Sequence, residues 1–173
     1  LPGAARAAET LNIPTSGLLS GDEGTVEFKM YVPALSSNAA YVFDCQHGAD
    51  NNNRILIYGT MTSIRALVGD GTTSVQTGLL SLQVGVNYIG LSWGASGIRF
   101  RVNDQSAAND GITRGPATVA TNMYLGSYSG GSYQGLSATY SDLRCTSYDK
   151  TDEEMAAAYA SGLPLALDEC TTY

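Results

Sequence analysis

The sequence predicts an all-β fold: a two-sheet antiparallel β-sandwich of the jelly-roll kind with one short C-terminal helix. Three observations predict it. Apolar and polar residues alternate in many short segments, glycine-rich turns separate these segments, and one capped helical segment follows the last of them. About ten short strands at regular spacing are typical of a sandwich or jelly roll. The 173 residues are enough for one domain with a hydrophobic core.

The first strand is predicted over residues 25–32 and ends before Pro33, which cannot donate to a sheet ladder. Every second side chain in it is apolar, so one face of the strand packs in the core. The inward set is Val26, Phe28, Met30 and Val32, and the outward set is Glu27, Lys29 and Tyr31. Further strands are predicted over 40–45, 54–58 and 63–68, with turns at 59–62 and 69–72.

The clearest pair of strands covers residues 87–93 and 98–102, joined by a hairpin loop over 94–97. The apolar residues of each strand share one face: Ile89, Leu91 and Trp93 in the first, and Ile98, Phe100 and Val102 in the second. Two later strands, 123–128 and 136–146, are predicted on either side of the loop Ser129-Gly130-Gly131-Ser132.

A helix is predicted to begin after Thr151, because Thr151 and Glu154 form a capping box. Asp152 and Glu153 suit the positive end of its dipole. Met155, Ala158 and Tyr159 fall on one stripe, and Gly162 ends the helix before Pro164. We expect this short helix to cover an edge or an end of a sheet.

Charge and composition exclude several partner classes. The net charge is −7, so the domain lacks the basic surface that nucleic acid or an anionic membrane surface requires. No apolar run reaches the roughly 18 residues of a membrane helix, so no membrane insertion is expected. The chain begins with Leu1, and we expect residues 1–173 to form a single domain within a larger protein.

Three cysteines leave at least one thiol unpaired. Cys45, Cys145 and Cys170 are either buried thiols, or Cys145 and Cys170 form a bridge that holds the tail to the last strand. No CxxC pair exists, so a structural zinc site is not expected.

Several motifs, in this order, resemble concanavalin A-like and laminin G-like domains. They are Asn87 to Trp93 followed by Ile98 to Asp104, Tyr124 to Ser127, Gly135 to Tyr148 with Asp142-Leu143-Arg144, and Thr151 to Met155. Where the family usually has a Val-Asn-Gly or Val-Asp-Gly turn, this chain has Val102-Asn103-Asp104. Ala8 to Pro14 with Gly24 to Glu27 resembles versions of this domain in bacteriophage tail and minor structural proteins. The resemblance implies the fold, but members include lectins, adhesion domains and glycoside hydrolases.

No pattern of catalytic residues stands out, and we expect the domain not to be an enzyme. The hydrolases of this fold carry paired carboxylates in an E-x-D-x-x-E or E-x-D-x-E run, which this chain lacks. Capping explains the acidic group Asp149, Asp152, Glu153 and Glu154. His47 could pair with Cys45 as base and nucleophile, or it could be a loop histidine near a buried thiol.

Loop residues are the first candidates for ligand contact. Tyr128 and Tyr133 bracket the 129–132 loop and could flank a sugar ring, or they could pack on a sheet edge. Asp70 and Asn103, at strand ends, are weaker candidates. The polar loop that contains Asp50 and Asn52 could bind a calcium ion or be a solvated turn, and no other cofactor is expected.

Two further hypotheses concern the strands. Trp93 could pack in the core or form a platform for stacking. Five basic residues fall within predicted strands, namely Lys29, Arg54, Arg65, Arg99 and Arg101. If these strands form the concave sheet, the groove would suit an acidic glycan; otherwise they line a solvated outer face.

These observations favour a carbohydrate-binding or receptor-binding module of a larger virion protein, such as a phage tail fibre, or of a cell-surface protein. We expect partners to be a glycan or a host-surface receptor, with avidity from several copies in an oligomer formed through the parent protein. The alternatives are a structural decoration or spacer domain that makes protein contacts within a particle and, third, a glycan-cleaving enzyme.

Overall fold

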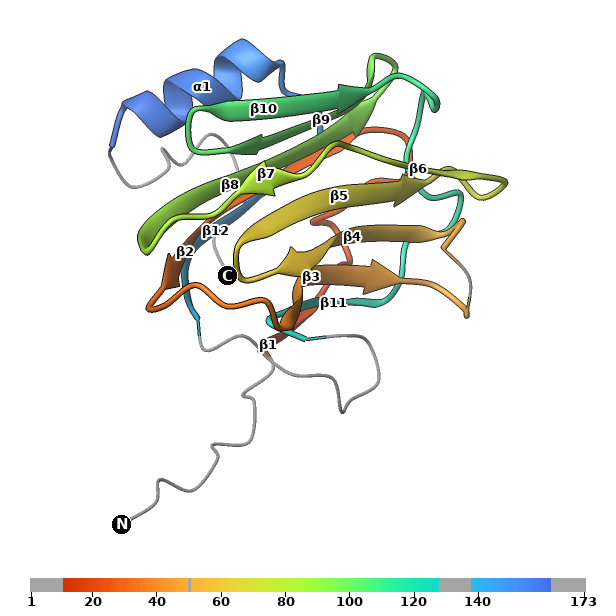
Figure 1. The fold of residues 1–173 in the computed structure, drawn as a ribbon. Helices are drawn as coiled ribbons and strands as arrows, with labels where there is room; N and C mark the ends of the chain where they lie inside the picture. Colours follow the sequence, from red (N-terminus) through yellow and green to blue (C-terminus); the bar gives the residue numbers. More distant parts are fainter. Residues whose placement is uncertain (1–10, 50, 128–137, 163–173) are drawn as a thin grey trace.

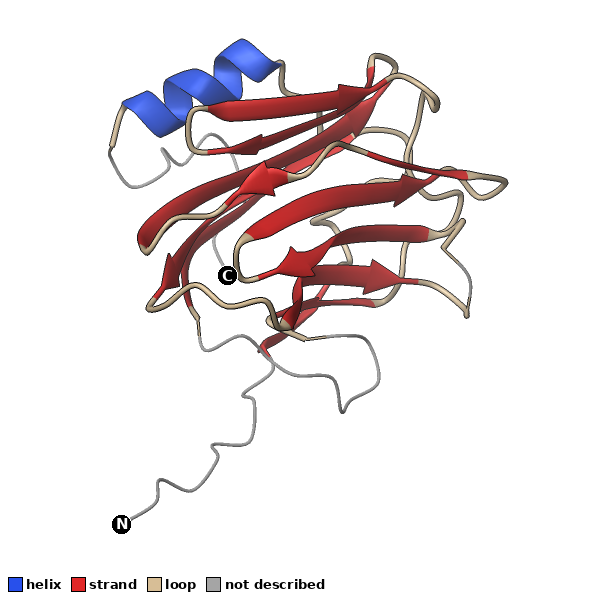
Figure 2. Cartoon of the chain, viewed as in Figure 1, coloured by secondary structure: helices blue, strands red, loops and turns tan. Residues whose placement is uncertain are grey.

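The computed structural model of the chain describes residues 11–49, 51–127 and 138–162. These residues form two antiparallel sheets that pack face to face and one short helix (Figures 1 and 2). The predicted two-sheet antiparallel sandwich with a C-terminal helix is confirmed.

The larger sheet, called sheet A, has seven strands. Its spatial order is β1 (Leu11–Pro14), β11 (Asn122–Leu125), β3 (Ala39–Gln46), β4 (Arg54–Thr60), β5 (Ser63–Gly69) and β6 (Ser74–Gln76), with β7 (Leu80–Ser81) also paired to β5. Sheet B has five strands, in the order β10 (Gln105–Asn109), β9 (Gly97–Val102), β8 (Gly85–Gly94), β2 (Gly24–Val32) and β12 (Thr139–Thr146).

The core lies between the sheets and contains the residues that the alternation predicted. The inward side chains of β2, β8 and β9 are fully buried: Val26, Phe28, Met30, Val32, Ile89, Leu91, Trp93, Ile98, Phe100 and Val102. In the register, Val26 lies opposite Leu91, and Leu91 lies opposite Phe100, so these inward side chains form continuous rows across sheet B.

Four strands were not predicted: β1, β6, β7 and β10. They are two to five residues long, and β10 has the sequence QSAAN, which carries no large apolar side chain. Their strand conformation is set by pairing with neighbours rather than by their own composition. Strand β11 ends at Leu125 rather than at residue 128, because Gly126 turns the chain with a φ of +76°.

Helix α1 (Asp152–Ala160) has the predicted capping box, in which the Thr151 hydroxyl accepts from the Glu154 N–H and the Glu154 carboxylate accepts from the Thr151 N–H. The helix lies beside β9 and β10 of sheet B, on the side away from sheet A (Figure 1). It packs on the outer face of sheet B, whereas the sequence predicted that it covers an edge or an end. The reason is Met155, which is fully buried against Tyr88 of β8.

Candidate functional site

The two outer faces of the sandwich differ in what covers them. We call the outer face of sheet B, under α1, the helix face, and the outer face of sheet A the open face, because no described helix or strand lies over it (Figure 1). A ligand that binds to a sheet needs an accessible face. The difference between the two faces therefore decides where binding can occur.

A buried polar cluster joins α1 to the helix face. Glu27 of β2 is completely buried, and its two carboxylate oxygens accept from the Tyr88 hydroxyl at 2.6 Å and the Lys150 ammonium at 2.7 Å. Arg101 of β9 donates to both carboxylate oxygens of Asp152, at 3.0 and 2.6 Å. Burial and the adjacent Glu27 charge raise the pKa of Tyr88, so its hydroxyl remains a donor. These side chains bind one another, so they are not available to a ligand.

Close packing accompanies this cluster. A Cβ atom at Gly90 of β8 would lie 2.8 Å from the Met155 sulfur and 2.9 Å from the Tyr88 hydroxyl oxygen. Only a residue without a side chain lets α1 approach the sheet this closely. The helix face under α1 is thus a packed interface and not a binding surface.

The condition for a single basic groove, that the strands with the basic residues form one sheet, is not met. The five basic strand residues divide between the sheets, with Lys29, Arg99 and Arg101 in sheet B and Arg54 and Arg65 in sheet A. Arg101, predicted to face a ligand, is buried and paired with Asp152. Arg99 is partly exposed, but its guanidinium lies 2.6 Å from a carboxylate oxygen of Asp110.

Trp93 cannot be a platform for stacking, because it is fully buried in the core and its indole N–H donates to the Ser20 carbonyl at 3.1 Å. Asn103 is also buried, in the turn that links β9 to β10, with a φ of +55°. Its amide oxygen accepts from the Tyr88 N–H, and its amide nitrogen donates to Asn87. Both candidates are structural and cannot contact a ligand in this conformation.

Asp70 forms a turn at the rim of the sandwich. One of its carboxylate oxygens accepts from the N–H groups of Thr72 and Thr73, both at 2.8 Å, and these bonds lower the pKa of Asp70. The nearby Asn52 carbonyl accepts from the Gly71 N–H. Asp50, the other residue of the calcium hypothesis, lies outside the described residues. Among those described, no group of three His, Cys, Asp or Glu side chains could hold a metal ion.

The pairing of Cys45 with His47 as nucleophile and base is not formed. Cys45 faces the core, and burial raises the pKa of its thiol to about 12, whereas His47 is exposed beyond the end of β3. Cys145 is buried as well, and the predicted bridge to Cys170 stays a prediction because Cys170 lies outside the described residues. Tyr128 and Tyr133 also lie outside the described residues, so their contact with a sugar ring stays a prediction.

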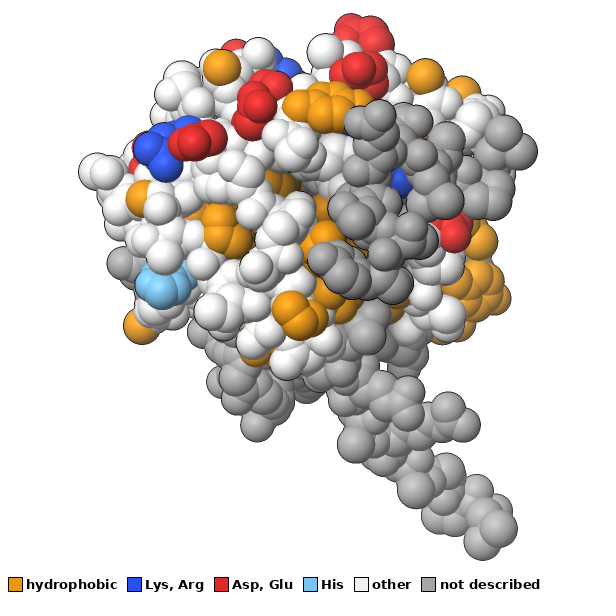
Figure 3. Space-filling view, turned by 180° about the vertical axis from the view of Figure 1, so that it is seen from behind, with side chains coloured by type: hydrophobic (Ala, Val, Ile, Leu, Met, Phe, Trp, Pro, Cys, Tyr) orange, Lys and Arg blue, Asp and Glu red, His pale blue; other side chains and the backbone are white. Residues whose placement is uncertain are grey.

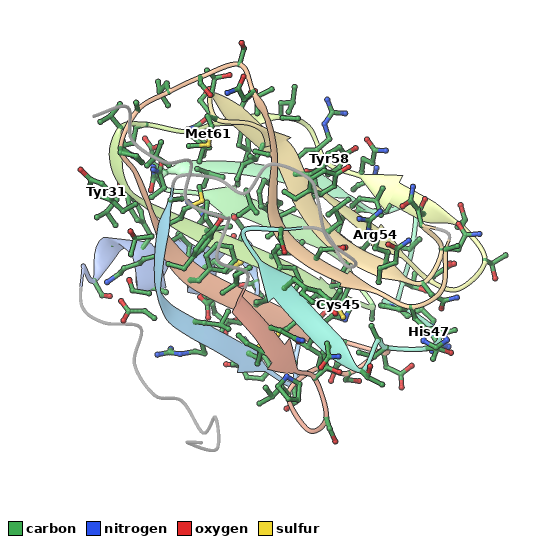
Figure 4. The ribbon with its side chains drawn as sticks, turned by 90° about the horizontal axis from the view of Figure 1, so that it is seen from below. Tyr31, Cys45, His47, Arg54, Tyr58 and Met61 are labelled. Atoms are coloured by element: carbon green, nitrogen blue, oxygen red, sulfur yellow. The ribbon has the colours of Figure 1, made fainter. Side chains whose placement is uncertain are left out.

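The open face carries a row of aromatic and polar side chains, of which the sequence singled out only Arg65, as one of five basic strand residues. Tyr41 of β3, Tyr58 of β4 and Arg65 of β5 are cross-strand partners in one row. All three are partly buried, which leaves part of each side chain accessible. Figure 4 shows Tyr58 and Arg54 on the side of sheet A and Tyr31 on the opposite side of the molecule.

A second row runs beside the first on the open face. Tyr124 lies opposite Asp44, Asp44 opposite Leu56, and Leu67 opposite Gln76, across β11, β3, β4, β5 and β6. Asp44 is completely buried, and the Arg54 Nε atom donates to it at 2.7 Å. Arg54 also donates to the Asn51 side chain at 2.8 Å. Leu56 and Leu67 of this row are buried as well. A Cβ atom at Gly69 of β5 would collide with the carbonyl oxygens of Asn51 and Asn52, so the loop before β4 packs against this end of the face. The accessible part of the open face is therefore the row of Tyr41, Tyr58 and Arg65.

The alternation of β4 contains a signal that could have identified this face. Arg54, Leu56 and Tyr58 share one parity, and Ile55 and Ile57 share the other. Because four of these five residues are large and apolar or aromatic, the segment looks like a strand buried on both sides, and the outward parity is obscured. Pairing of Tyr58 with Tyr41 and Arg65 follows from register, which the sequence does not specify.

Comparison with known proteins defines the class of fold. No family model matches the sequence, and no curated protein matches it. Solved structures do match. Trypanosoma rangeli sialidase superposes with a TM-score of 0.62 at 15% identity, over 85% of this chain and 24% of the sialidase. Domains LG4-5 of the mouse laminin alpha1 chain give 0.57 at 13% identity, over 83% of this chain and 39% of theirs.

The binding domain of botulinum neurotoxin serotype D gives a TM-score of 0.64 at 10% identity, over 91% of this chain and 41% of that domain. This chain therefore spans about a quarter to two fifths of the structures that it matches. At these identities the likeness shows the fold alone. The fold is a concanavalin A-like, laminin G-like jelly roll, as the motifs of the sequence predicted.

Proposed function

We propose that this chain is a non-catalytic binding module that holds a glycan, or the glycan of a host-surface receptor, against the open face. The observation that carries the proposal is the row of Tyr41, Tyr58 and Arg65 on a sheet face that no described element covers. A tyrosine ring can cover the apolar face of a pyranose, and its hydroxyl together with neighbouring polar groups can bind the sugar hydroxyls.

Two features of the rest of the molecule support this choice of face. The helix face is closed by α1 and its buried ion pairs, so it offers no comparable surface beneath the helix. Among the structural neighbours, one is a botulinum neurotoxin receptor-binding domain, of which this chain covers 40%. Receptor binding is thus present among proteins that contain this fold.

The setting that we propose is a larger virion protein of the phage-tail kind, or an extracellular cell-surface protein. The resemblance of Ala8 to Pro14 and of Gly24 to Glu27 to phage tail domains supports the first. The negative net charge argues against nucleic acid as partner. No helix in the described part of the chain is long and apolar enough to cross a membrane.

Tyr58→Ala tests the proposal on a broad array of immobilised glycans, with the protein presented as a multivalent assembly so that weak sites are detected. Tyr31→Ala is the matched control, because Tyr31 is an exposed tyrosine on the opposite side of the sandwich (Figure 4). We expect Tyr58→Ala to weaken glycan binding roughly tenfold or more, as loss of a central aromatic contact does. No retention of any glycan, or loss of binding in Tyr31→Ala alone, would overturn the proposal.

A structural role is the second candidate, and one observation favours it. Tyr31, Val84 and Val86 are 47%, 59% and 57% exposed, and Tyr31 lies opposite Val86 in the register of β2 and β8. Figure 3 shows hydrophobic side chains at the edge of the molecule where β2 ends and β8 begins. An apolar patch of this kind is common at protein contacts.

The same two variants separate the candidates. If the patch makes protein contacts, sedimentation velocity of the wild-type protein shows concentration-dependent association that Tyr31→Ala removes and Tyr58→Ala does not. A monomer at all accessible concentrations, together with glycan binding that depends on Tyr58, leaves only the binding module.

A further inference from the structure

Arg65 differs from the other cations of the chain. The described residues include eight Lys and Arg side chains: Lys29, Arg54, Arg65, Arg99, Arg101, Arg114, Arg144 and Lys150. Six of them form ion pairs with Asp or Glu, and Arg144, which has no such pair, is buried directly across from Glu27. Arg65 is therefore the one accessible cation in the described part of the chain that no carboxylate pairs.

The hydrogen bonding of Arg65 leaves most of its guanidinium available. Its Nη1 atom donates to the side-chain oxygen of Gln76 at 3.2 Å, and Gln76 carries no charge. A guanidinium has five N–H donors in a planar fork that matches the paired oxygens of a carboxylate or sulfate. The Gln76 contact uses one of these donors and holds the side chain across β5 and β6 without neutralising it.

The surroundings of Arg65 carry little negative charge. Within the strands of sheet A, the charged residues are Asp44, Arg54 and Arg65, which gives two positive charges against one negative. Asp44 is buried and paired with Arg54. The strands of sheet A thus carry one excess positive charge, that of Arg65, on a chain whose net charge is −7.

The position of Arg65 relates this charge to the proposed sugar platform. In the register of β4 and β5 it lies directly across from Tyr58, and Tyr58 lies across from Tyr41. Cross-strand partners have Cβ atoms about 5 Å apart, so the Tyr58 ring and the Arg65 guanidinium can contact neighbouring parts of one ligand. A ring on Tyr58 would place such a substituent within reach of Arg65.

We propose that the glycan of the open face is acidic and that Arg65 binds its anionic group, a carboxylate or a sulfate, while Tyr58 covers the sugar ring. This inference rests on the proposed binding function of the open face and specifies the chemical class of its ligand. The other accessible Lys and Arg side chains among the described residues are paired with carboxylates, so we expect Arg65 to determine the preference for an anion.

Matched glycan pairs test the charge of the ligand. The array carries sialylated glycans with their desialylated forms, sulfated glycans with their desulfated forms, and uronic acid oligomers with their methyl esters. We expect the acidic member of a pair to bind at least tenfold more tightly than its neutral form, and added NaCl to reduce the difference. Which kind of pair responds distinguishes a carboxylate from a sulfate.

Arg65→Gln removes the charge, and Arg99→Gln is the control, because Arg99 is a partly exposed arginine of sheet B paired with Asp110. We expect Arg65→Gln to abolish the preference for acidic glycans, Arg65→Lys to retain part of it, and Arg99→Gln to leave it unchanged. Circular dichroism confirms that each variant is folded.

The possible failures are distinguishable. If neutral and acidic partners bind equally and binding still requires Tyr58, the anionic ligand is ruled out and the binding module stands. The same conclusion follows if Arg65→Gln leaves the acidic preference intact. If no glycan of any kind is retained, both proposals fail together.

Discussion

The two outer faces of the sandwich are built from the same kind of alternating strands, but a helix covers part of one and no described helix covers the other. On the helix face, outward polar residues such as Glu27 and Arg101 are buried beneath or beside α1 and satisfied by Lys150, Tyr88 and Asp152. On the open face, outward residues such as Tyr58 and Arg65 stay partly accessible. Outward-pointing polar side chains on a strand therefore do not by themselves indicate a surface that a ligand can reach.

We expect the helix face to contribute to stability and the open face to contribute to binding. The ion pairs of the helix face are internal and hold α1 in place, so changes there should alter stability. Tyr58 and Arg65 of the open face are partly accessible, so changes there should alter binding. Four variants or conditions test this division, beginning with the largest expected effect.

Glu27→Ala should have the largest effect on stability. It leaves the Lys150 ammonium and the Tyr88 hydroxyl buried without their acceptor. Breaking a buried ion pair in this way costs about 3–5 kcal/mol in the free energy of unfolding. Urea denaturation measures this loss of stability. The control is Asp110→Ala, which breaks an exposed ion pair with Arg99 and should cost less than about 1 kcal/mol. Equal costs for the two variants would show that the helix face is not held by its buried pairs.

Met155→Ala removes the apolar contact between α1 and sheet B. Met155 is fully buried against Tyr88, and truncation of a buried methionine lowers the free energy of unfolding by about 2–3 kcal/mol. Because the sandwich core is untouched, limited proteolysis should cleave within α1 before it cleaves the strands. Glu153→Ala, an exposed change in the same helix, is the control, and the same cleavage in both variants would argue against the packing of α1 on the sheet.

The buried Cys45 thiol in the core should make the stability of the fold depend on pH. Burial is the main cause that raises the pKa of the Cys45 thiol from 9.0 to about 12. A backbone hydrogen bond with Ala120 lowers this pKa by a smaller amount, and the charge of Asp44 on β3 raises it by less again. The folded state therefore keeps the thiol proton where the unfolded chain loses it. The stability that Cys45 contributes is present below the unfolded pKa and falls as pH rises from about 9 towards 12, by about 1.4 kcal/mol at pH 10.

Denaturation of the wild type and of Cys45→Ala at neutral and alkaline pH isolates this effect from that of the buried tyrosines. The stability difference between the two proteins should change in favour of Cys45→Ala as pH rises. A difference independent of pH would mean that the thiol is hydrated rather than buried.

Tyr58→Ala and Arg65→Gln should have the smallest effect on stability. Both side chains lie on the open face and are partly accessible. We expect Arg65→Gln to lower the free energy of unfolding by about 0.5 kcal/mol or less, and Tyr58→Ala by about 1 kcal/mol. Thermal unfolding measures both. A loss as large as that of Glu27→Ala would show that the open face is part of the folded framework and would remove the contrast.

The sequence predicted the inner side of the sandwich well and the outer sides poorly. Alternation fixed which residues of β2, β8 and β9 face the core, because period-two patterns depend only on local geometry. The capping box of α1 is equally local and was also predicted. By contrast, Glu27 was placed on an outward face, which is correct for its strand, but its complete burial depends on where α1 docks.

The residues of the candidate site were not predicted as a group for the same reason, because they depend on tertiary packing and strand register. Arg101 was a candidate for ligand contact because its parity points away from the core, yet packing against Asp152 buries it. Trp93 packs in the core, which was one of its two predicted alternatives. The row of Tyr41, Tyr58 and Arg65 depends on the register of three strands, including the shift in β3 between Tyr41 and Phe43. Neither docking nor register can be obtained from one sequence by pattern alone.

The most direct test of the account is a titration followed through the tyrosine rings. The protein is labelled with carbon-13 in its tyrosines, the signals are assigned by single Tyr→Phe substitutions, and a glycan retained on the array is added. The account predicts that the Tyr58 ring signals shift with saturation while those of Tyr31 and Tyr159, on the opposite side, stay in place. Shifts at Tyr31 or Tyr159 with an unchanged Tyr58 signal would contradict it.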